Sequence, residues 1–135
     1  MLDRALVRSV VGIPYVEDGM DLVKDGGLNC WGLVRHVMLG IGRHDFPRYE
    51  QYVERCSTWL LRGLDSFCTD FVPVIVPEPG DFVALKVPGE GEWHIGIMID
   101  NITFLHTSRK TGAQIGRINH PVFRRVIKGY YRWIG

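Results

Sequence analysis

The segment 28–34, Leu-Asn-Cys-Trp-Gly-Leu-Val, opens the clearest helix in the sequence. After Cys30 the apolar residues recur at the spacing of one helical face, as Leu33, Val34, Val37, Met38 and Ile41. Asn29 is a good N-cap, because its side-chain oxygen can accept a backbone N–H that the first turn leaves unpaired. Gly40 and Gly42 supply the stop. The pattern predicts a helix over 30–41 with Cys30 in its first turn and on its inward face.

The two halves of the chain differ in their hydrophobic period. Helical spacing predicts further helices at 2–11 and 49–62 and a short turn at 64–72, with loops over 12–28 and 43–48. After Pro79 the period changes from about 3.6 to 2 residues. It predicts strands at 82–87, 93–99, 103–107, 113–118 and 128–134, with a short helix at 119–126. Helices followed by an antiparallel sheet indicate an α+β fold.

Length and composition exclude several classes of protein. The chain has 135 residues, of which 46% are hydrophobic and 23% charged, so we expect one ordinary globular domain over 1–135. A formal net charge of +1 gives no basic excess for nucleic-acid binding. No apolar run approaches the roughly 20 residues that span a bilayer, so no membrane span is expected. Charges at Asp3, Arg4 and Arg8 interrupt the N-terminal segment, which therefore lacks a signal-peptide pattern.

The three cysteines do not form a recognisable disulfide or zinc pattern. Cys30, Cys56 and Cys68 are odd in number, with long spacings and no Cys-x-x-Cys. We expect Cys56 and Cys68 to lie in the core and no metal or cofactor to be needed. Cys30 differs, because a helix N-terminus favours the thiolate over the thiol. A nearby imidazole at His94 would complete a nucleophile and base pair, and His106 could orient that imidazole.

The residues around this constellation follow a family pattern in order along the chain. They are Gly12-Ile13-Pro14-Tyr15, the segment around Cys30, Pro79-Gly80-Asp81-Phe82-Val83, His94-Ile95-Gly96-Ile97-Met98-Ile99 and Phe104-Leu105-His106-Thr107-Ser108. This series resembles the NlpC family of papain-like cell-wall cysteine peptidases, from about residue 6 to the C-terminus. With a Trp directly after the Cys, the sequence resembles the branch of this family that is found in tail proteins of long-tailed bacteriophages.

The resemblance implies a papain-like NlpC-type fold, with a helical N-terminal half packed on a C-terminal antiparallel sheet. It implies that Cys30 is the nucleophile, His94 the general base and acid, and His106 the orienting residue. Tyr15 would lie where an oxyanion forms or substrate docks. The implied activity is cleavage of peptidoglycan stem peptides without metal or cofactor. The resemblance also implies that the protein is made in the host cytoplasm and becomes part of a phage tail tip, together with other tail-tip proteins. There it would help to open the host cell wall during genome entry.

The sequence departs from the family pattern on both sides of the nucleophile. Asn29 replaces an Asp and Trp31 replaces a Ser, and in many relatives these help to recognise a free amine of the stem peptide. Trp31 would either wall one side of the cleft or pack the helix onto the sheet. Without the Asp, recognition of an amine would fall to a carboxylate of the 17–25 loop, namely Glu17, Asp18, Asp21 or Asp25. The segment 43–78 also differs from compact secreted members and would carry partner contacts.

One geometric condition follows from strand alternation. His94 and His106 must share a face of the sheet if one is to orient the other. A two-residue turn at Asp100-Asn101 would place them on opposite faces. The assignment therefore predicts an odd-length loop or a bulge between residues 98 and 103.

Other readings remain open from the sequence. The domain could be a catalytically silent structural part of a tail tip, or an amidase or acyltransferase of the same fold. We expect His36, His44 and His120 to be exposed and without a role. A basic cluster near the C-terminus is either a solvated face, which we favour, or a dock for an acidic polymer or partner; it comprises Arg124, Arg125, Lys128 and Arg132.

Overall fold

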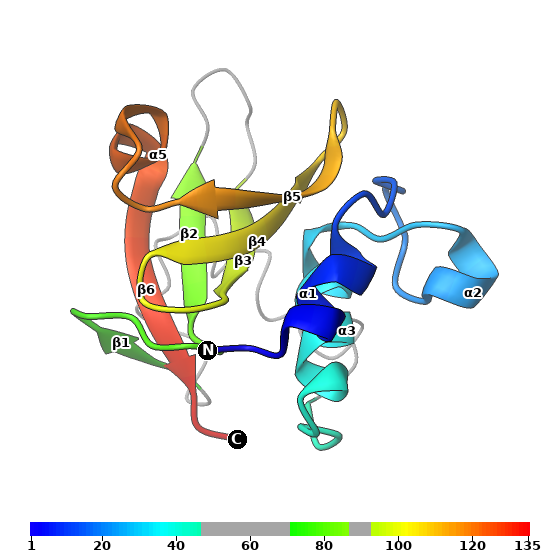
Figure 1. Ribbon diagram of the computed structural model, residues 1–135, viewed down its shortest axis with the longest axis horizontal. Coiled ribbons are helices and arrows are strands. Elements are labelled where there is room, and N and C mark those ends of the chain that lie inside the picture. Colours follow the sequence, from blue (N-terminus) through cyan, green and yellow to red (C-terminus); the bar gives the residue numbers. More distant parts are fainter. Residues whose placement is uncertain (47–70, 87–92) are drawn as a thin grey trace.

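The computed structural model describes residues 1–46, 71–86 and 93–135. The first part of the chain forms α1 (Arg4–Val10), α2 (Leu22–Asp25) and α3 (Cys30–Gly40). The second part forms β1 (Phe71–Val74), β2 (Phe82–Lys86), β3 (Trp93–Met98), β4 (Thr103–Ser108), β5 (Gly112–Arg117), α5 (Pro121–Val126) and β6 (Ile127–Trp133). Helices α1, α2 and α3 gather on one side of an antiparallel sheet, and α5 lies on the other side (Figure 1). This arrangement confirms the α+β prediction.

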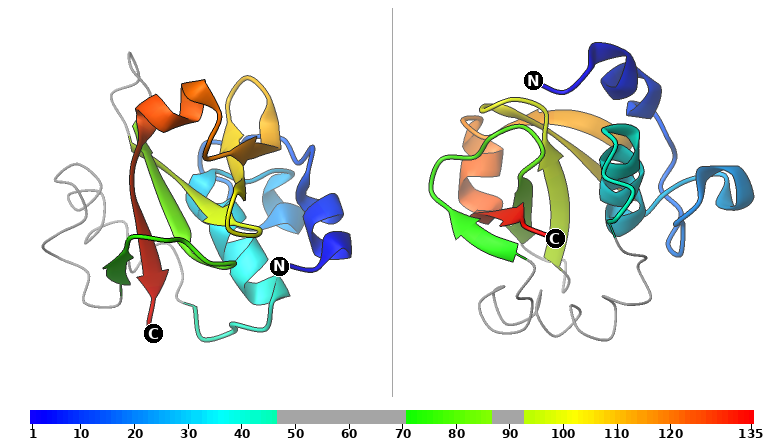
Figure 2. Two further views of the ribbon diagram at one scale, coloured as in Figure 1. Left: turned by 60° about the vertical axis from the view of Figure 1, so that its left-hand side comes forward. Right: turned by 90° about the horizontal axis from the view of Figure 1, so that it is seen from below.

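The sheet has six strands in the order β1-β6-β2-β3-β4-β5, and every neighbouring pair is antiparallel. Its two faces carry separate hydrophobic clusters. The first cluster packs α1 and α3 against the sheet, where Leu33 and Val34 lie with Ile95 and Ile97. The second joins Val83, Leu85, Met98, Phe104 and Val126. Figure 2 shows α3 and α5 on opposite sides of the strands. Strand alternation explains this division, because successive side chains of β3 enter different clusters.

The predicted elements agree with the structure except at two short segments. The predicted strands over 82–134 are all present, with ends shifted by at most two residues. Helix α2 was missed because it buries no residue and so lacks an apolar period; Asp21 caps it by accepting hydrogen bonds from Val23 and Lys24. Strand β1 was missed because Pro73 argues against a strand, although an edge strand tolerates it; residues 71–72 belong to this strand and not to the predicted short turn at 64–72, the rest of which lies outside the described residues. The predicted helix at 49–62 lies outside the described residues.

The turn between β3 and β4 confirms the predicted odd-length loop. The Ile99 N–H donates to the Thr103 carbonyl at 2.8 Å, which leaves the odd-length loop 100–102 between them. The Asp100 carboxylate holds this loop by accepting hydrogen bonds from the N–H groups of Ile102 and Thr103. The resulting register pairs Ile97 with Leu105 and Met98 with Phe104.

The Pro-Gly-Asp motif before β2 has a structural role. Asp81 is 2% exposed and accepts two hydrogen bonds from Arg132, each at 2.9 Å, and one from the Glu78 N–H. Hydrogen bonding to Asp81 raises the pKa of Arg132. Arg132, which lies on β6, is therefore paired with the buried carboxylate of Asp81 and is not part of a free basic surface. This corrects the sequence-based grouping of Arg132 with Arg124, Arg125 and Lys128.

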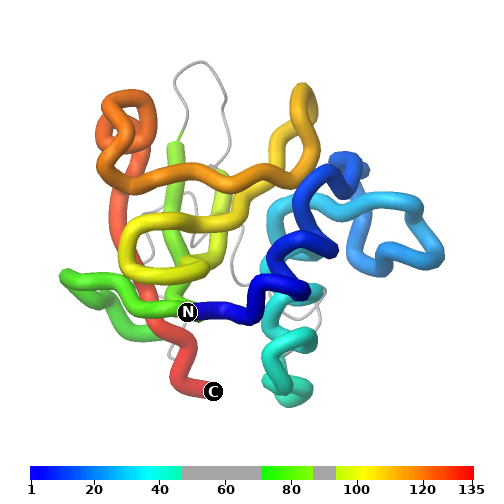
Figure 3. Tube along the Cα trace, in the orientation of Figure 1, coloured from blue at the N-terminus to red at the C-terminus, as the bar shows by residue number. Residues whose placement is uncertain are grey.

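The loop over 12–29 is held between the sheet and α3. Gly12 and Ile13 exchange backbone hydrogen bonds with Ala113 of β5, so the loop after α1 runs beside the β4–β5 turn (Figure 3). Farther along, the Asn29 N–H donates to the Gly19 carbonyl at 2.9 Å. That carbonyl lies directly against Gly32, where a Cβ would collide with it. The glycine in the helix start is thus required by a close approach of two backbones.

Within the described ranges, the structure contains no helix with both the length and the apolar character needed to cross a bilayer.

We predict that Gly32→Ala destabilises the protein by about 2 kcal/mol, because the new methyl group displaces the Gly19 carbonyl and its hydrogen bond to Asn29. The measurement is urea denaturation followed by circular dichroism. Gly40→Ala is the matched control on the same helix, since its Cβ would meet only the flexible end of Leu6. Equal stability of the two variants would contradict the close-packing argument.

Candidate active site

Cys30 is the first residue of α3 and a free thiol of intermediate exposure. Its side chain packs against the first hydrophobic cluster, which confirms the predicted inward face. Asn29 caps the helix, with its side-chain oxygen accepting the Gly32 N–H at 2.8 Å. The positive end of the α3 dipole therefore lies at the sulfur and favours its anionic form.

Both the oxygen and the nitrogen of the Asn29 side-chain amide form hydrogen bonds within the protein. It is 4% exposed, and besides the cap its Nδ2 donates to the Glu17 carbonyl at 2.9 Å. An Asp at this position could cap the helix but could not donate to that carbonyl. The residue thus ties the 12–29 loop to the start of α3. Its predicted part in substrate choice stays a prediction.

His94 and His106 lie on the same face of the sheet. His94 is the second residue of β3, and the β3–β4 register places His106 opposite Gly96. A Cβ on Gly96 would stand 3.5 Å from the His106 Cβ, so the two positions are direct neighbours on this face. His94 and His106 also interact electrostatically. The geometric condition set by strand alternation is therefore met.

His106 sits in an apolar and aromatic environment. Its ring centroid lies 5.2 Å from that of Phe104 and 5.1 Å from that of Phe123. Burial, and secondarily the charge of His94, lowers the pKa of His106 to about 4. At neutral pH the imidazole is uncharged, so one of its nitrogens can accept a hydrogen bond.

Cys30 and the two histidines lie on different faces of the sheet along most of β3. Ile95 and Ile97 of β3 point into the cluster beneath α3, and alternation turns His94 to the face that α5 covers. Cys30 begins α3 and His94 stands near the beginning of β3, and both elements begin toward the upper end of Figure 1. The catalytic assignment requires the thiol and His94 to meet at the ends of these two elements. The three-residue assignment stays a prediction.

Tyr15 is half-buried and lies in the loop that runs beside the segment leading into Cys30. The Leu28 N–H donates to the Pro14 carbonyl, which holds the two segments together. The Arg109 guanidinium lies 5.8 Å from the Tyr15 ring centroid and forms an ion pair with Glu17 at 2.8 Å. Sequence reasoning did not find Arg109, because no local pattern signals a contact between residues 92 apart.

Trp31 is 4% exposed and belongs to the first hydrophobic cluster. Of the two roles that the sequence left open, the structure supports packing of α3 onto the sheet. Its predicted role in substrate binding stays a prediction.

The remaining histidines differ in their surroundings. His36 is half-buried rather than exposed, and burial lowers its pKa. His44 is exposed, as predicted. His120 is the N-cap of α5, with Nδ1 accepting the Val122 N–H at 3.2 Å. In the described part of the chain, no three His, Cys, Asp or Glu side chains are grouped so that they could hold a metal ion. Cys56 and Cys68 lie outside it.

Solved structures with the same fold are found in several proteins at low sequence identity. The NlpC/p60 domain of the peptidoglycan hydrolase SagA superposes with a TM-score of 0.60 at 19% identity, over 95% of this chain and 93% of that one. An NLP/P60 family protein of Staphylococcus aureus subsp. aureus Mu50, described as similar to lipoprotein, gives 0.63 at 18% identity. An NlpC/P60 family protein of Bacillus cereus ATCC 10987 gives 0.62 at 18%.

The chain covers only part of two of these structures. It is aligned over 99% and 96% of its own length to the S. aureus and B. cereus proteins but spans 43% and 39% of theirs. A comparison with curated proteins gives no significant match. The family model for NlpC/P60 matches residues 12–132. That match includes the 12–29 loop, the helix that begins at Cys30 and both histidine strands, and the chain therefore belongs to the NlpC/P60 family.

Proposed function

We propose that this protein is a cysteine endopeptidase that cleaves peptidoglycan stem peptides, with Cys30 as nucleophile, His94 as general base and acid, and His106 as the orienting residue. The observation that carries the proposal is the pair of imidazoles on one face of the sheet, of which His106 is held neutral. The position of Cys30 at a capped helix start supplies the complementary feature. SagA, a structural relative, is itself described as a peptidoglycan hydrolase.

In the proposed reaction His94 takes the proton of Cys30, and the thiolate attacks the carbonyl carbon of the scissile amide. His94 then protonates the leaving amine as the C–N bond breaks, which leaves a thioester on Cys30. Water, deprotonated by His94, attacks the thioester carbon; the C–S bond breaks, the peptide carboxylic acid leaves, and the proton held by His94 returns to Cys30. Partial burial and the neighbouring His94 lower the pKa of His106, so its neutral imidazole has a nitrogen that can accept a hydrogen bond; in the proposed reaction it uses this nitrogen to orient His94. In this proposal Tyr15 lies where the oxyanion forms or the substrate docks.

We further propose that the protein acts from a bacteriophage tail tip, together with other tail-tip proteins, when the phage opens the host wall. The support is the position of Trp31 directly after Cys30, which resembles the pattern of the tail-associated branch of the family. The test is proteomic analysis of purified virions. Absence of the chain from intact virions of its phage would contradict this placement.

The first prediction of the proposed function concerns the thiol. Alkylation of Cys30 should show an inflection below the free-thiol value of about 8.5, because the helix N-terminus and an imidazole favour the thiolate. Iodoacetamide labelling across pH, followed residue by residue with mass spectrometry, measures it. Cys56 and Cys68 in the same chain are internal controls.

Cys30→Ser should abolish release of peptides from peptidoglycan without changing the circular dichroism spectrum, since the substitution is nearly isosteric. Mass spectrometry of the products identifies the bond that is cut. Labelling of Cys30 no faster than the other cysteines, with no product formed, would favour a structural role. Cleavage at the bond to the sugar would favour an amidase.

The second prediction concerns pH and stability. The folded-state pKa of His106, about 4, lies below its ordinary value of 6.5, so the unfolded chain binds this proton more tightly. The contribution of the neutral His106 to the free energy of unfolding is complete above pH 6.5. It is lost as the pH falls toward 4, and the loss is about 3 kcal/mol at most. Urea denaturation at pH 7.5 and 4.5 should show a smaller difference for His106→Gln than for wild type. An unchanged difference would contradict the burial argument.

The third prediction concerns substrate choice. Asn29 has no charge, Glu17 pairs with Arg109, and the carboxylates of Asp21 and Asp25 accept backbone N–H groups. Asp18 is the member of the predicted carboxylate set that forms no hydrogen bond or ion pair within the described residues. We therefore expect little preference for a free amine, which is held best by an opposing carboxylate.

Stem peptides attached to glycan should be cleaved at least as fast as detached peptides with a free amino end. Paired assays on whole sacculi and on free stem peptide measure the ratio. A strong preference for the free peptide that disappears when its amine is acetylated would contradict the prediction. Asp18→Asn then shows whether that carboxylate is responsible.

A further inference from the structure

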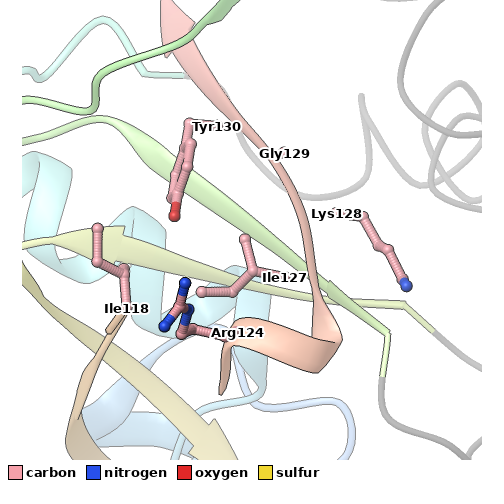
Figure 4. Close-up of a pocket in the computed structure, with 6 residues that line it drawn as sticks. All are labelled: Ile118, Arg124, Ile127, Lys128, Gly129 and Tyr130. Atoms are coloured by element: carbon pink, nitrogen blue, oxygen red, sulfur yellow. The ribbon is translucent and has the colours of Figure 1, made fainter. Parts of the chain in front are cut away.

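A pocket of about 340 Å³ opens between α5 and the beginning of β6, away from the helices of the N-terminal half. Figure 4 shows its lining residues, Ile118, Arg124, Ile127, Lys128, Gly129 and Tyr130. The Arg124 guanidinium and the Tyr130 hydroxyl point toward each other across the space, with Ile118 and Ile127 beside them. Lys128 lies at the rim and points away.

The pocket has a positive charge that no acidic side chain among its lining residues offsets. Within the described ranges Arg124 and Lys128 form no ion pair, whereas Arg43, Arg109 and Arg132 each have an acidic partner. Burial raises the pKa of Tyr130, so its hydroxyl remains a hydrogen-bond donor across the neutral range. A guanidinium and a phenol directed at one point are suited to an anionic oxygen.

The pocket adjoins the face of the sheet that carries the two histidines. Ile118, Ile127 and Tyr130 pack against the second hydrophobic cluster together with Phe123. The Phe123 ring also contacts His106, at 5.1 Å between centroids. Phe123 thus connects the pocket to the candidate active site, and Arg124 is the next residue on α5.

We propose that this pocket binds a carboxylate of the peptidoglycan stem peptide, with Arg124 and Tyr130 holding the carboxylate oxygens and Ile118 and Ile127 contacting the adjoining methyl or methylene groups. Stem peptides combine free carboxylates with short aliphatic side chains, which corresponds to this mixed lining. A polyol phosphate offers the charge without the apolar part. The inference rests on the proposed function and extends it by naming a second contact region for the same substrate.

The test compares Arg124→Gln and Tyr130→Phe with Arg125→Gln, an exposed neighbour on α5 that does not line the pocket. Each is made in the full chain carrying Cys30→Ala, so that binding is measured without cleavage. The probes are a free stem tetrapeptide and the same peptide with its carboxylates amidated. Isothermal titration calorimetry gives the Kd.

We expect Arg124→Gln to weaken tetrapeptide binding by roughly three- to ten-fold, as for loss of one partly exposed charge-assisted contact. Tyr130→Phe should weaken binding by a smaller factor, and Arg125→Gln should match the parent protein. All proteins should bind the amidated peptide equally. Equal Kd values for the Arg124 and Arg125 variants, or a loss that persists with the amidated peptide, would overturn the inference.

Two further measurements separate failure of the pocket from failure of the proposed function. With Cys30 intact, Arg124→Gln should raise KM for the tetrapeptide while kcat stays near the wild-type value. Normal cleavage with an unchanged KM rejects the pocket alone, whereas a protein that neither binds nor cleaves stem peptide rejects both. Tighter binding of a glycerol phosphate oligomer than of the tetrapeptide, lost in Arg124→Gln, would assign the pocket to a different polymer and also overturn the inference.

Discussion

The Asn29 amide is the contact on which the arrangement of the candidate site depends. Its oxygen caps α3 and its nitrogen holds the Glu17 carbonyl, so one buried side chain fixes both the helix that presents Cys30 and the loop that carries Tyr15. The backbone reinforces this junction, because Gly32 lets the Gly19 carbonyl approach the helix closely. A buried amide with unmet hydrogen bonds costs free energy, so loop and helix are stable only together.

The sheet separates packing from chemistry by its alternation. One face of β3 and β4 contributes Ile95, Ile97 and Leu105 to the cluster beneath α3, which is the larger of the two clusters formed by the described residues. The other face carries His94 and His106 beside the aromatic rings that α5 provides. The apolar surroundings that stabilise this face also keep His106 neutral. Burial thus stabilises the fold and sets the protonation state of a candidate catalytic residue at once.

Electrostatic pairing distinguishes structural cations from those free to bind ligands. Arg132 forms an ion pair with the buried Asp81, and Arg109 forms one with Glu17. Arg124, in contrast, lines a pocket. Four basic residues close together in the sequence therefore have different roles. The difference arises from the strand register, which brings Arg132 beside β2 and leaves the end of α5 in solvent.

The sequence alone determined the elements whose signals are local. The apolar period and the Asn29 cap predicted α3 with Cys30 at its start, and the spacing of the two histidines required the odd-length loop that residues 100–102 form. Tertiary structure alone decided the burial of Trp31, the partner of Arg132, the contact of Arg109 with Glu17 and the neutrality of His106. These depend on groups far apart in the chain, and neither hydrophobic period nor capping preference contains information about which distant surfaces meet.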